Sequence, residues 1–315
     1  MIACYKCNAA CAHCMYGCSP YLDDEYITEE NAARFCEKVR RLGCRGMHIG
    51  GGEPFLNADG LVKLINAMKK SGVEVDYVET NGDWVSGDKK RDLKIINEVM
   101  SAGGNCIMVS ADFFHVEFIP FRRTKYLIDL LESEGIYNFV WQRRFLSALD
   151  GLDPKKKYSR GDLINELGYD AVSECAREYG MGFNGRALNL LRLIGRCRDH
   201  GDFLSAAPCE NLTNSGHFHV DLYGRYVPPG CTGMGIDLND LGKKIAADAY
   251  PVVSRLFYGG LKELFIYAVS RGFEPGGEGY VSKCELCFSM RKYLAENEPE
   301  SHPDLNPKWY YKQDF

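Results

Sequence analysis

The feature that most constrains this chain is a cysteine loop near its N-terminus. It reads Cys7-Asn-Ala-Ala-Cys11-Ala-His-Cys14, with Cys4 and Cys18 on either side. Three thiolates on one short loop can bind three irons of a cubane 4Fe–4S cluster, which leaves the fourth iron free to bind a small molecule. A zinc loop is the alternative, although zinc sites usually take four ligands in two separated pairs.

Length, charge and cysteine content set the broad class. A chain of 315 residues predicts one large barrel or two domains. The net charge of −5 does not indicate the basic surface that nucleic-acid binding requires. The sequence has no run of about 18 apolar residues that could span a membrane, and no signal-peptide core. We therefore expect a cytoplasmic protein with no nucleic-acid or membrane partner, in which the 14 cysteines are metal ligands more often than disulfides.

Strand and helix patterns alternate through the first two thirds of the chain. Strands are expected over residues 1–6, 46–49, 73–79, 106–110 and 137–142 and from about Gly182; helices are expected over 28–42, 60–71, 89–102, 124–133 and 171–179. Thr28 is expected to cap the first helix and Gly43 to end it. The polar segment 149–168 is expected to be a solvated loop, or else an insertion over the barrel mouth. This order predicts an α/β fold, a partial (β/α)6 TIM-type barrel with its active site at the strand C-terminal ends.

Short motifs follow the expected strands where such a site would lie. Each is also typical of an ordinary turn or cap when taken alone. Their ordered succession behind the cysteine loop indicates a built site. The motif residues are Gly51, Gly52, Glu53 and Pro54 after the second strand, Thr80 and Asn81 after the third, Ser110 and Asp112 after the fourth, and Arg186 within Gly185-Arg186-Ala187 after the sixth.

The cysteine spacing and these motifs resemble the signature of the radical S-adenosylmethionine (radical-SAM) enzymes, over residues 1 to about 195. The resemblance implies that Cys7, Cys11 and Cys14 hold a 4Fe–4S cluster whose open iron chelates SAM. It also implies an electron donor such as flavodoxin or ferredoxin, and a 5′-deoxyadenosyl radical that abstracts hydrogen from a substrate. The motif residues would contact SAM. His13 would pack near adenine, or else be a simple loop histidine.

The C-terminal third carries a second group of cysteines. Cys209 precedes an expected hairpin over 217–227, Cys231 follows it, and Cys284 and Cys287 open an expected helix to about residue 295. Four such thiols can hold zinc or a fully ligated 4Fe–4S cluster. Their order resembles the Twitch and SPASM auxiliary-cluster domains, although six residues separate Gly224 from Cys231 where that pattern has four. We expect a barrel domain over 1–200 and an auxiliary domain over 201–315. One or two helices within 250–273 are expected to cover the barrel as core-packing elements, or else to form a peptide-docking surface, and the tail over 299–315 is expected to be irregular.

Within that branch the layout resembles the radical-SAM peptide epimerases of epipeptide biosynthesis. The shared features are the Ser-x-Asp-x-x-His segment, the hairpin bearing His and Asp, and the final C-x2-C. The resemblance implies an oxidoreductase or epimerase acting on a ribosomally made precursor peptide. Those enzymes use a cysteine directly after the hairpin's cluster ligand to return hydrogen, and here that position is Thr232. Either another cysteine donates, with Cys4, Cys18 and Cys106 as candidates, or the product is a cross-link.

Two other functions remain open from the sequence. The same radical machinery could act on a small metabolite such as a sugar or amino acid. A non-catalytic iron–sulfur or zinc carrier is the alternative from another class. Gly51-Gly52-Glu53-Pro54, Ser110 and Asp112 argue against a carrier, because a carrier needs no SAM pocket.

Overall fold

The computed structural model describes residues 1–178, 184–214 and 216–313 and divides the chain into two compact units. The first comprises Met1–Cys11, Cys18–Tyr179 and Val220–Gly224. The second comprises Ala12–Gly17, Gly180–His219 and Arg225–Phe315. The cysteine loop therefore contributes residues to both units.

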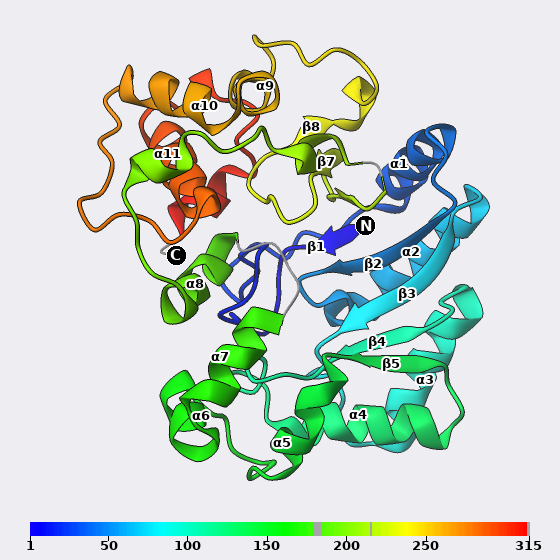
Figure 1. Cartoon of the computed structure of the whole chain (residues 1–315). Helices are drawn as coiled ribbons and strands as arrows, with labels where there is room; N and C mark the ends of the chain where they lie inside the picture. Colours follow the sequence, from blue (N-terminus) through cyan, green and yellow to red (C-terminus); the bar gives the residue numbers. More distant parts are fainter. Residues whose placement is uncertain (179–183, 215, 314–315) are drawn as a thin grey trace. The chain divides into compact units, whose positions relative to one another are not determined.

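A parallel sheet forms the centre of the first unit. Its strands are β1 (Ile2–Cys4), β2 (Gly46–Gly51), β3 (Glu74–Thr80), β4 (Ile107–Ser110) and β5 (Asn138–Trp141). They lie side by side in sequence order, and each neighbouring pair is parallel (Figure 1). Parallel neighbours require crossover connections, so the carboxyl ends of all five strands meet at one edge of the sheet. The expected α/β barrel-type fold is confirmed; the strand expected from about Gly182 begins outside the described residues.

Four helices supply the crossovers between these strands. Thr28 caps the first, since its hydroxyl accepts a hydrogen bond from the Asn31 N–H at 3.2 Å, and Gly43 follows its end with φ +98°. The helix expected from Thr124 begins earlier, at Phe121, because Pro120 has a fixed φ that suits the residue before a helix. The helices are α1 (Glu29–Arg41), α2 (Ala58–Lys70), α3 (Lys89–Ala102) and α4 (Phe121–Ser133), and η1 (Pro54–Asn57) precedes α2.

The segment after β5 is partly helical, so the expectation of a solvated loop over 149–168 holds for the exposed residues near 151–157 and is wrong for α6. Ser159 and Asp162 form a capping box, in which each side chain accepts a hydrogen bond from the other's backbone N–H. This box starts a helix where the lysine-rich composition had suggested solvated chain. The elements here are η2 (Arg143–Phe145), α5 (Leu146–Asp150), α6 (Arg160–Leu167) and α7 (Tyr169–Glu178).

The C-terminal third contains short strands and a helical group. The strands β6 (His219–Val220), β7 (Arg225–Val227) and β8 (Ile236–Asp237) form a small sheet in that order, so the expected hairpin is present but shorter. Helix α10 packs against α9 and α11, consistent with the core-packing role expected for residues 250–273. The helices are α8 (Leu188–Ile194), α9 (Pro251–Tyr258), α10 (Gly260–Val269) and α11 (Lys283–Asn297), with η3 (Gly185–Ala187), η4 (His200–Phe203), η5 (Glu210–Thr213) and η6 (Leu238–Asp240) between them.

The expectation of an irregular tail is wrong for two short stretches of it. It forms η7 (Pro299–Ser301) and η8 (Lys308–Lys312), and Tyr310 and Tyr311 are buried. Asp304 accepts hydrogen bonds from the N–H groups of Val252 and Val253 at 2.7 and 2.8 Å, which satisfies the free donors at the start of α9. Burial of the Tyr310 and Tyr311 rings stabilises the folded tail.

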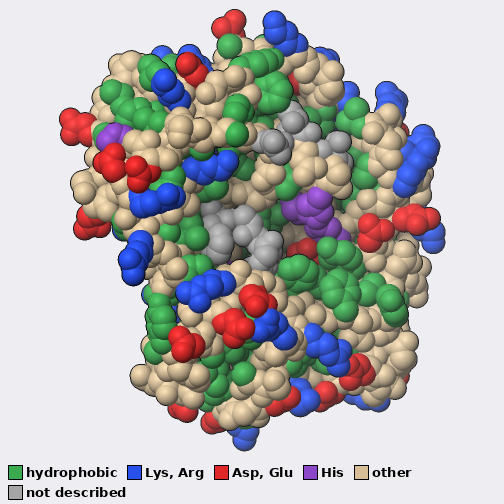
Figure 2. Space-filling view, viewed as in Figure 1, with side chains coloured by type: hydrophobic (Ala, Val, Ile, Leu, Met, Phe, Trp, Pro, Cys, Tyr) green, Lys and Arg blue, Asp and Glu red, His purple; other side chains and the backbone are tan. Residues whose placement is uncertain are grey.

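The surface carries mixed charge. On the face shown in Figure 2, basic and acidic side chains are interspersed rather than gathered into one patch. None of the helices in the described part of the chain has the length and apolar character needed to cross a membrane.

Candidate active site

Two glycines bring the end of β2 against the chain entering the cysteine loop. The N–H of Gly52 donates to the Cys4 carbonyl at 2.8 Å, and the N–H of Glu53 donates to the Lys6 carbonyl at 3.0 Å. A Cβ at Gly52 would lie 1.9 Å from the Lys6 carbonyl oxygen, and one at Gly51, where φ is +127°, would lie 2.4 Å from that of Cys4. No larger residue fits such an approach, so these glycines hold the loop's entry strand in place.

Glu53 joins the ends of two strands. Its carboxylate is fully buried and accepts hydrogen bonds from the Phe55 N–H (3.1 Å), the Thr80 hydroxyl (3.0 Å) and the Asn81 N–H (2.7 Å). Burial raises the pKa of Glu53 to about 7, against the lowering effect of these hydrogen bonds. The side chain therefore fixes the turn after β3 relative to β2, while the buried Pro54 begins η1.

Asn81 connects that turn to the first cysteine. Its amide nitrogen donates to Cys7 Sγ at 3.6 Å and to Asn8 Oδ1 at 2.7 Å. The N–H of Ala9 also donates to Cys7 Sγ, at 3.4 Å. N–H groups directed at a sulfur stabilise a thiolate and tune a bound cluster, so the donor set around Cys7 fits an iron–sulfur ligand.

Further hydrogen bonds support this contact, and they come from residues that no sequence motif marked. Asn8 donates to the Asp83 carboxylate at 2.6 Å, and the Asp83 N–H donates to the Asn81 side-chain oxygen at 2.9 Å. Arg123 on α4 pairs with the same carboxylate at 3.0 Å. The only sequence signal was position, because Asn8 directly follows a cysteine and Asp83 directly follows Thr-Asn-Gly.

The other two loop cysteines lie in different units. Cys11 is buried in the first, and the half-buried Cys14 belongs to the second. Only two residues separate them, so their Cα atoms can be at most about 11 Å apart. The buried His13 is also in the second unit.

The chain after Cys14 is held by the tail. The Met15 carbonyl accepts hydrogen bonds from the Thr232 hydroxyl at 2.6 Å and the Tyr310 hydroxyl at 3.0 Å. A Cβ at Gly185, where φ is +57°, would lie 2.6 Å from that same carbonyl oxygen. Arg186 donates to the side-chain oxygen of Gln313 at 3.2 Å, so it too engages the tail.

Asp112 organises the turn after β4. One carboxylate oxygen accepts from the N–H groups of Phe114 and His115 at 2.8 and 3.1 Å, and the other lies 2.9 Å from His115 Nδ1. The side chain is fully buried, whereas Ser110, the last residue of β4, is half-buried. Cys175 on α7 lies nearby; burial raises the pKa of its thiol, and Asp112 adds to the effect.

The three candidate hydrogen donors are all buried. Cys4 lies at the end of β1, and burial raises the pKa of its thiol to about 12, so it carries its proton at neutral pH. Cys18 lies in the first unit, just beyond the cysteine loop. Cys106 precedes β4 and therefore lies at the sheet edge opposite the motif residues.

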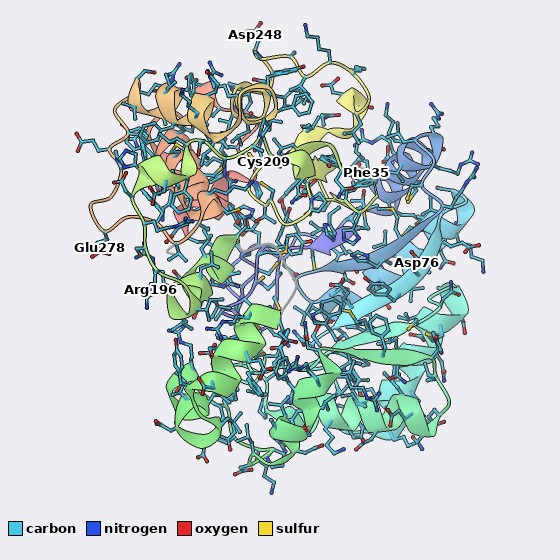
Figure 3. All side chains as sticks on the ribbon, in the orientation of Figure 1. Phe35, Asp76, Arg196, Cys209, Asp248 and Glu278 are labelled. Carbon is cyan, nitrogen blue, oxygen red and sulfur yellow. The ribbon has the colours of Figure 1, made fainter. Side chains whose placement is uncertain are left out.

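A second thiol site lies within the second unit, where Figure 3 labels Cys209. Cys231 follows the Pro-Pro-Gly turn, and Cys284 and Cys287 lie in the first turns of α11, which Ser282 caps. Burial raises the pKa of Cys231, and the nearby Cys287, Cys284 and Cys209 raise it further. All four cysteines that the sequence suggested as a second ligand set thus lie in the second unit.

One family model matches the N-terminal part of the chain. Residues 1–133 match the family model described as "Radical SAM superfamily". This match covers the stretch in which the cysteine loop and most of the strand-end motifs resemble that superfamily.

Individual proteins that resemble this chain have low sequence identity to it. The chain is 24% identical over 201 residues to a "Probable GTP 3',8-cyclase" of Methanothermobacter marburgensis, covering 62% of this chain and 58% of that one. It is 25% identical over 128 residues to a "Putative peptide biosynthesis protein YydG" of Bacillus subtilis, covering 39% and 38%. A crystal structure of Streptococcus suis SuiB bound to S-adenosylmethionine is similar with a TM-score of 0.34 and 14% identity, over 90% of this chain and 75% of that one. The matches thus span less than two thirds of both curated relatives.

Proposed function

We propose that this protein is a radical SAM enzyme that reductively cleaves SAM and abstracts a hydrogen atom from a ribosomally synthesised peptide. The product would be an epimerised or a cross-linked residue. The match to the family model supports the enzyme class, and the similarity to YydG supports a peptide substrate.

The observation that carries this proposal is the environment of Cys7. Its sulfur receives N–H donors from Asn81 and Ala9, and the same Asn81 turn is fixed by the buried Glu53. A zinc or electron-carrier loop would not need two strand-end motifs, those after β2 and β3, tied to one cysteine. Cys7, Cys11 and Cys14 would hold the cluster, which, when bound, supplies the electron that converts SAM to a 5′-deoxyadenosyl radical.

The remaining residues of the site would bind and orient. Glu53 and Asp112 are committed to holding the turns after β2 and β4, so we assign them the task of shaping the SAM pocket. The backbone at Gly51 and Gly52 and the half-buried Ser110 would face SAM more directly. A small protein such as flavodoxin or ferredoxin would deliver the electron.

The four thiols of the second unit would hold an auxiliary 4Fe–4S cluster. Thr232, next to Cys231, has its hydroxyl bonded to Met15 and Tyr310, and a hydroxyl is a far poorer hydrogen-atom donor than a thiol. This arrangement favours either oxidation of the substrate radical to a cross-link or donation by another cysteine. We favour Cys4, because it ends β1 directly before the cysteine loop and its buried thiol carries its proton at neutral pH.

A small-molecule substrate is the second candidate. The match to the probable GTP 3',8-cyclase covers more of this chain than the match to YydG does. A non-catalytic metal carrier is the third, and measurement of SAM binding separates it from both enzymes.

The test begins with anaerobic reconstitution, reduction and quantification of 5′-deoxyadenosine. We expect two clusters per chain and SAM cleavage in the wild type, and loss of cleavage in Cys7→Ala, Cys11→Ala and Cys14→Ala. The exposed Cys197→Ala is the control and should retain cleavage. Candidate peptides and nucleotides are then turned over in deuterated water: a one-dalton gain marks exchange from a thiol, and a two-dalton loss marks a new bond. A reconstituted wild type that binds SAM but releases no 5′-deoxyadenosine would refute the proposal.

A further inference from the structure

Arg291 is a buried cation next to the second thiol site. It lies on α11, four residues after Cys287, and residues at this spacing are neighbours on one helix face. Only 1% of Arg291 is exposed. A guanidinium removed from water at this depth is costly unless an anion or a full set of hydrogen bonds compensates for it.

The hydrogen bonds of Arg291 go to neutral groups. One terminal nitrogen donates to the Thr232 carbonyl at 2.7 Å and to the Tyr311 hydroxyl at 2.9 Å, and the other donates to the Asn184 side-chain oxygen at 3.0 Å. Asn184 in turn donates to the Gly230 carbonyl, just before Cys231. These contacts position the guanidinium but do not neutralise its charge.

The nearby groups that can become negative are the cysteines of the site and two tyrosines. Burial lowers the pKa of Arg291, but the net shift is upward because of the nearby Tyr311, Cys287, Cys231 and Tyr310. Burial raises the pKa of Cys287 to about 11, and Arg291 acts in the opposite direction. The Nε–H of Arg291 has no hydrogen-bond partner among the described residues, although it is buried. A fixed positive charge and a spare buried donor beside four thiols indicate a site built for an anionic group.

We propose that Arg291 is a positioning residue whose buried charge raises the reduction potential of an iron–sulfur cluster bound by Cys209, Cys231, Cys284 and Cys287. The inference rests on the proposed auxiliary cluster. Four thiolates around a 4Fe–4S core give a net negative assembly, and one-electron reduction makes it more negative by one charge. A nearby cation therefore stabilises the reduced form more than the oxidised form.

This arrangement gives the second cluster the character of an electron acceptor. A substrate radical that is not quenched by a thiol must lose one electron and one proton when it forms a cross-link. A cluster whose reduced form is stabilised by Arg291 can take that electron. The same residue also connects the site to the first cysteine loop, because Thr232 bonds Arg291 through its carbonyl and Met15 through its hydroxyl.

The test is a redox titration of the reconstituted full-length protein, followed by electron paramagnetic resonance, on the wild type and on Arg291→Met, Arg291→Gln and Arg291→Lys. We expect a more negative midpoint potential for the second cluster in the two neutral variants and a potential closer to wild type in Arg291→Lys. Tyr311→Phe removes one partner of Arg291 without changing the charge and should leave the potential near that of the wild type. The potential of the first cluster should not change in any variant.

Iron content separates the possible failures. A wild type with about four irons per chain, or with zinc in the second site, overturns the auxiliary cluster and the role of Arg291 with it. A wild type with about eight irons and equal potentials in the neutral variants overturns the role of Arg291 alone. If the neutral variants lose the second cluster, retention in Arg291→Lys supports the charge as the cause, and loss in all three variants assigns Arg291 a purely structural role and overturns the proposal.

Discussion

The side-chain amide of Asn81 donates a hydrogen bond to Cys7 Sγ at 3.6 Å, across 74 residues of sequence. The contact links the turn after β3 to the first thiol of the cysteine loop. It is made possible by Glu53, whose carboxylate holds the Asn81 backbone N–H. The start of the cysteine loop and the turns after β2 and β3 are therefore parts of one hydrogen-bonded assembly.

Replacement of Asn81 by Asp tests this link. The side chain keeps its size, but the donor to Cys7 becomes a carboxylate that repels a thiolate. Outer-shell changes of this kind typically cost about 10–100-fold in metal affinity, so we expect iron to be lost to a chelator at least about tenfold more readily. Asn297→Asp, on the exposed end of α11, is the matched control. Equal rates of iron loss in Asn81→Asp and wild type would show that the contact is incidental.

Glu53 predicts a pH dependence of stability. Its pKa rises from an ordinary value of 4.5 to about 7 on burial in the folded protein. Between these values the unfolded chain has released the proton and the folded chain still holds it, so the free energy of unfolding falls as pH rises from about 4.5 to 7 and then levels. The fall attributable to this group is about 3 kcal/mol.

Glu53→Gln removes this titration and should flatten the pH profile of urea unfolding between pH 5 and 8. Glu79, whose pKa burial also raises to about 7, remains in both proteins and leaves a residual slope. Glu37→Gln on the exposed face of α1 is the control and should keep the wild-type profile. A Glu53→Gln profile as steep as that of wild type would contradict the assignment.

The close approach at Gly52 predicts intolerance to a single methyl group. Gly52→Ala places a Cβ 1.9 Å from the Lys6 carbonyl oxygen, which belongs to the backbone and cannot rotate away. We expect a loss of roughly 2 kcal/mol or more in the free energy of unfolding. Gly277→Ala, where no atom lies within 4 Å of the added carbon, should change stability by less than about 0.5 kcal/mol. Comparable stabilities for the two variants would remove the packing explanation for Gly52.

The fold was predictable wherever local signals agreed with the tertiary structure. The Thr28 cap and the bounds of α3 follow from nearby residues and were correctly anticipated. Asp304 caps α9 from 52 residues away, and no local pattern indicates that. The helix α6 was missed because a lysine-rich composition outweighed the capping box at Ser159.

The site was predictable in its residue types but not in their tasks. The motifs singled out Glu53 and Asn81, yet only burial reveals that Glu53 holds strand ends together. Asn8 and Arg291 stand near cysteines in the sequence, but no local pattern indicates their roles. Their significance comes from tertiary contacts with Asn81 and with the second thiol site, which a single sequence does not encode locally.

Thr232 and Tyr310 share one acceptor, the Met15 carbonyl next to Cys14. Their hydroxyls are also 2.5 Å apart, so the three groups form a closed triangle. Thr232→Val keeps the shape of the side chain and removes one hydroxyl, and Tyr310→Phe removes the other. Each should cost about 1–2 kcal/mol, because a buried carbonyl then loses one of two donors.

The double variant should not equal the sum of the singles. Each single variant already breaks the contact between the two hydroxyls, so the second substitution cannot break that contact again. The second substitution instead removes the last hydroxyl donor from the Met15 carbonyl. We expect a coupling of about 0.5 kcal/mol or more in a double-mutant cycle measured by urea unfolding. The pair Thr232→Val and Gly277→Ala should be additive and serves as the control, because the carbon added at Gly277 contacts no other atom. Additivity within about 0.3 kcal/mol for Thr232 and Tyr310 would mean that the two hydroxyls hold the loop independently.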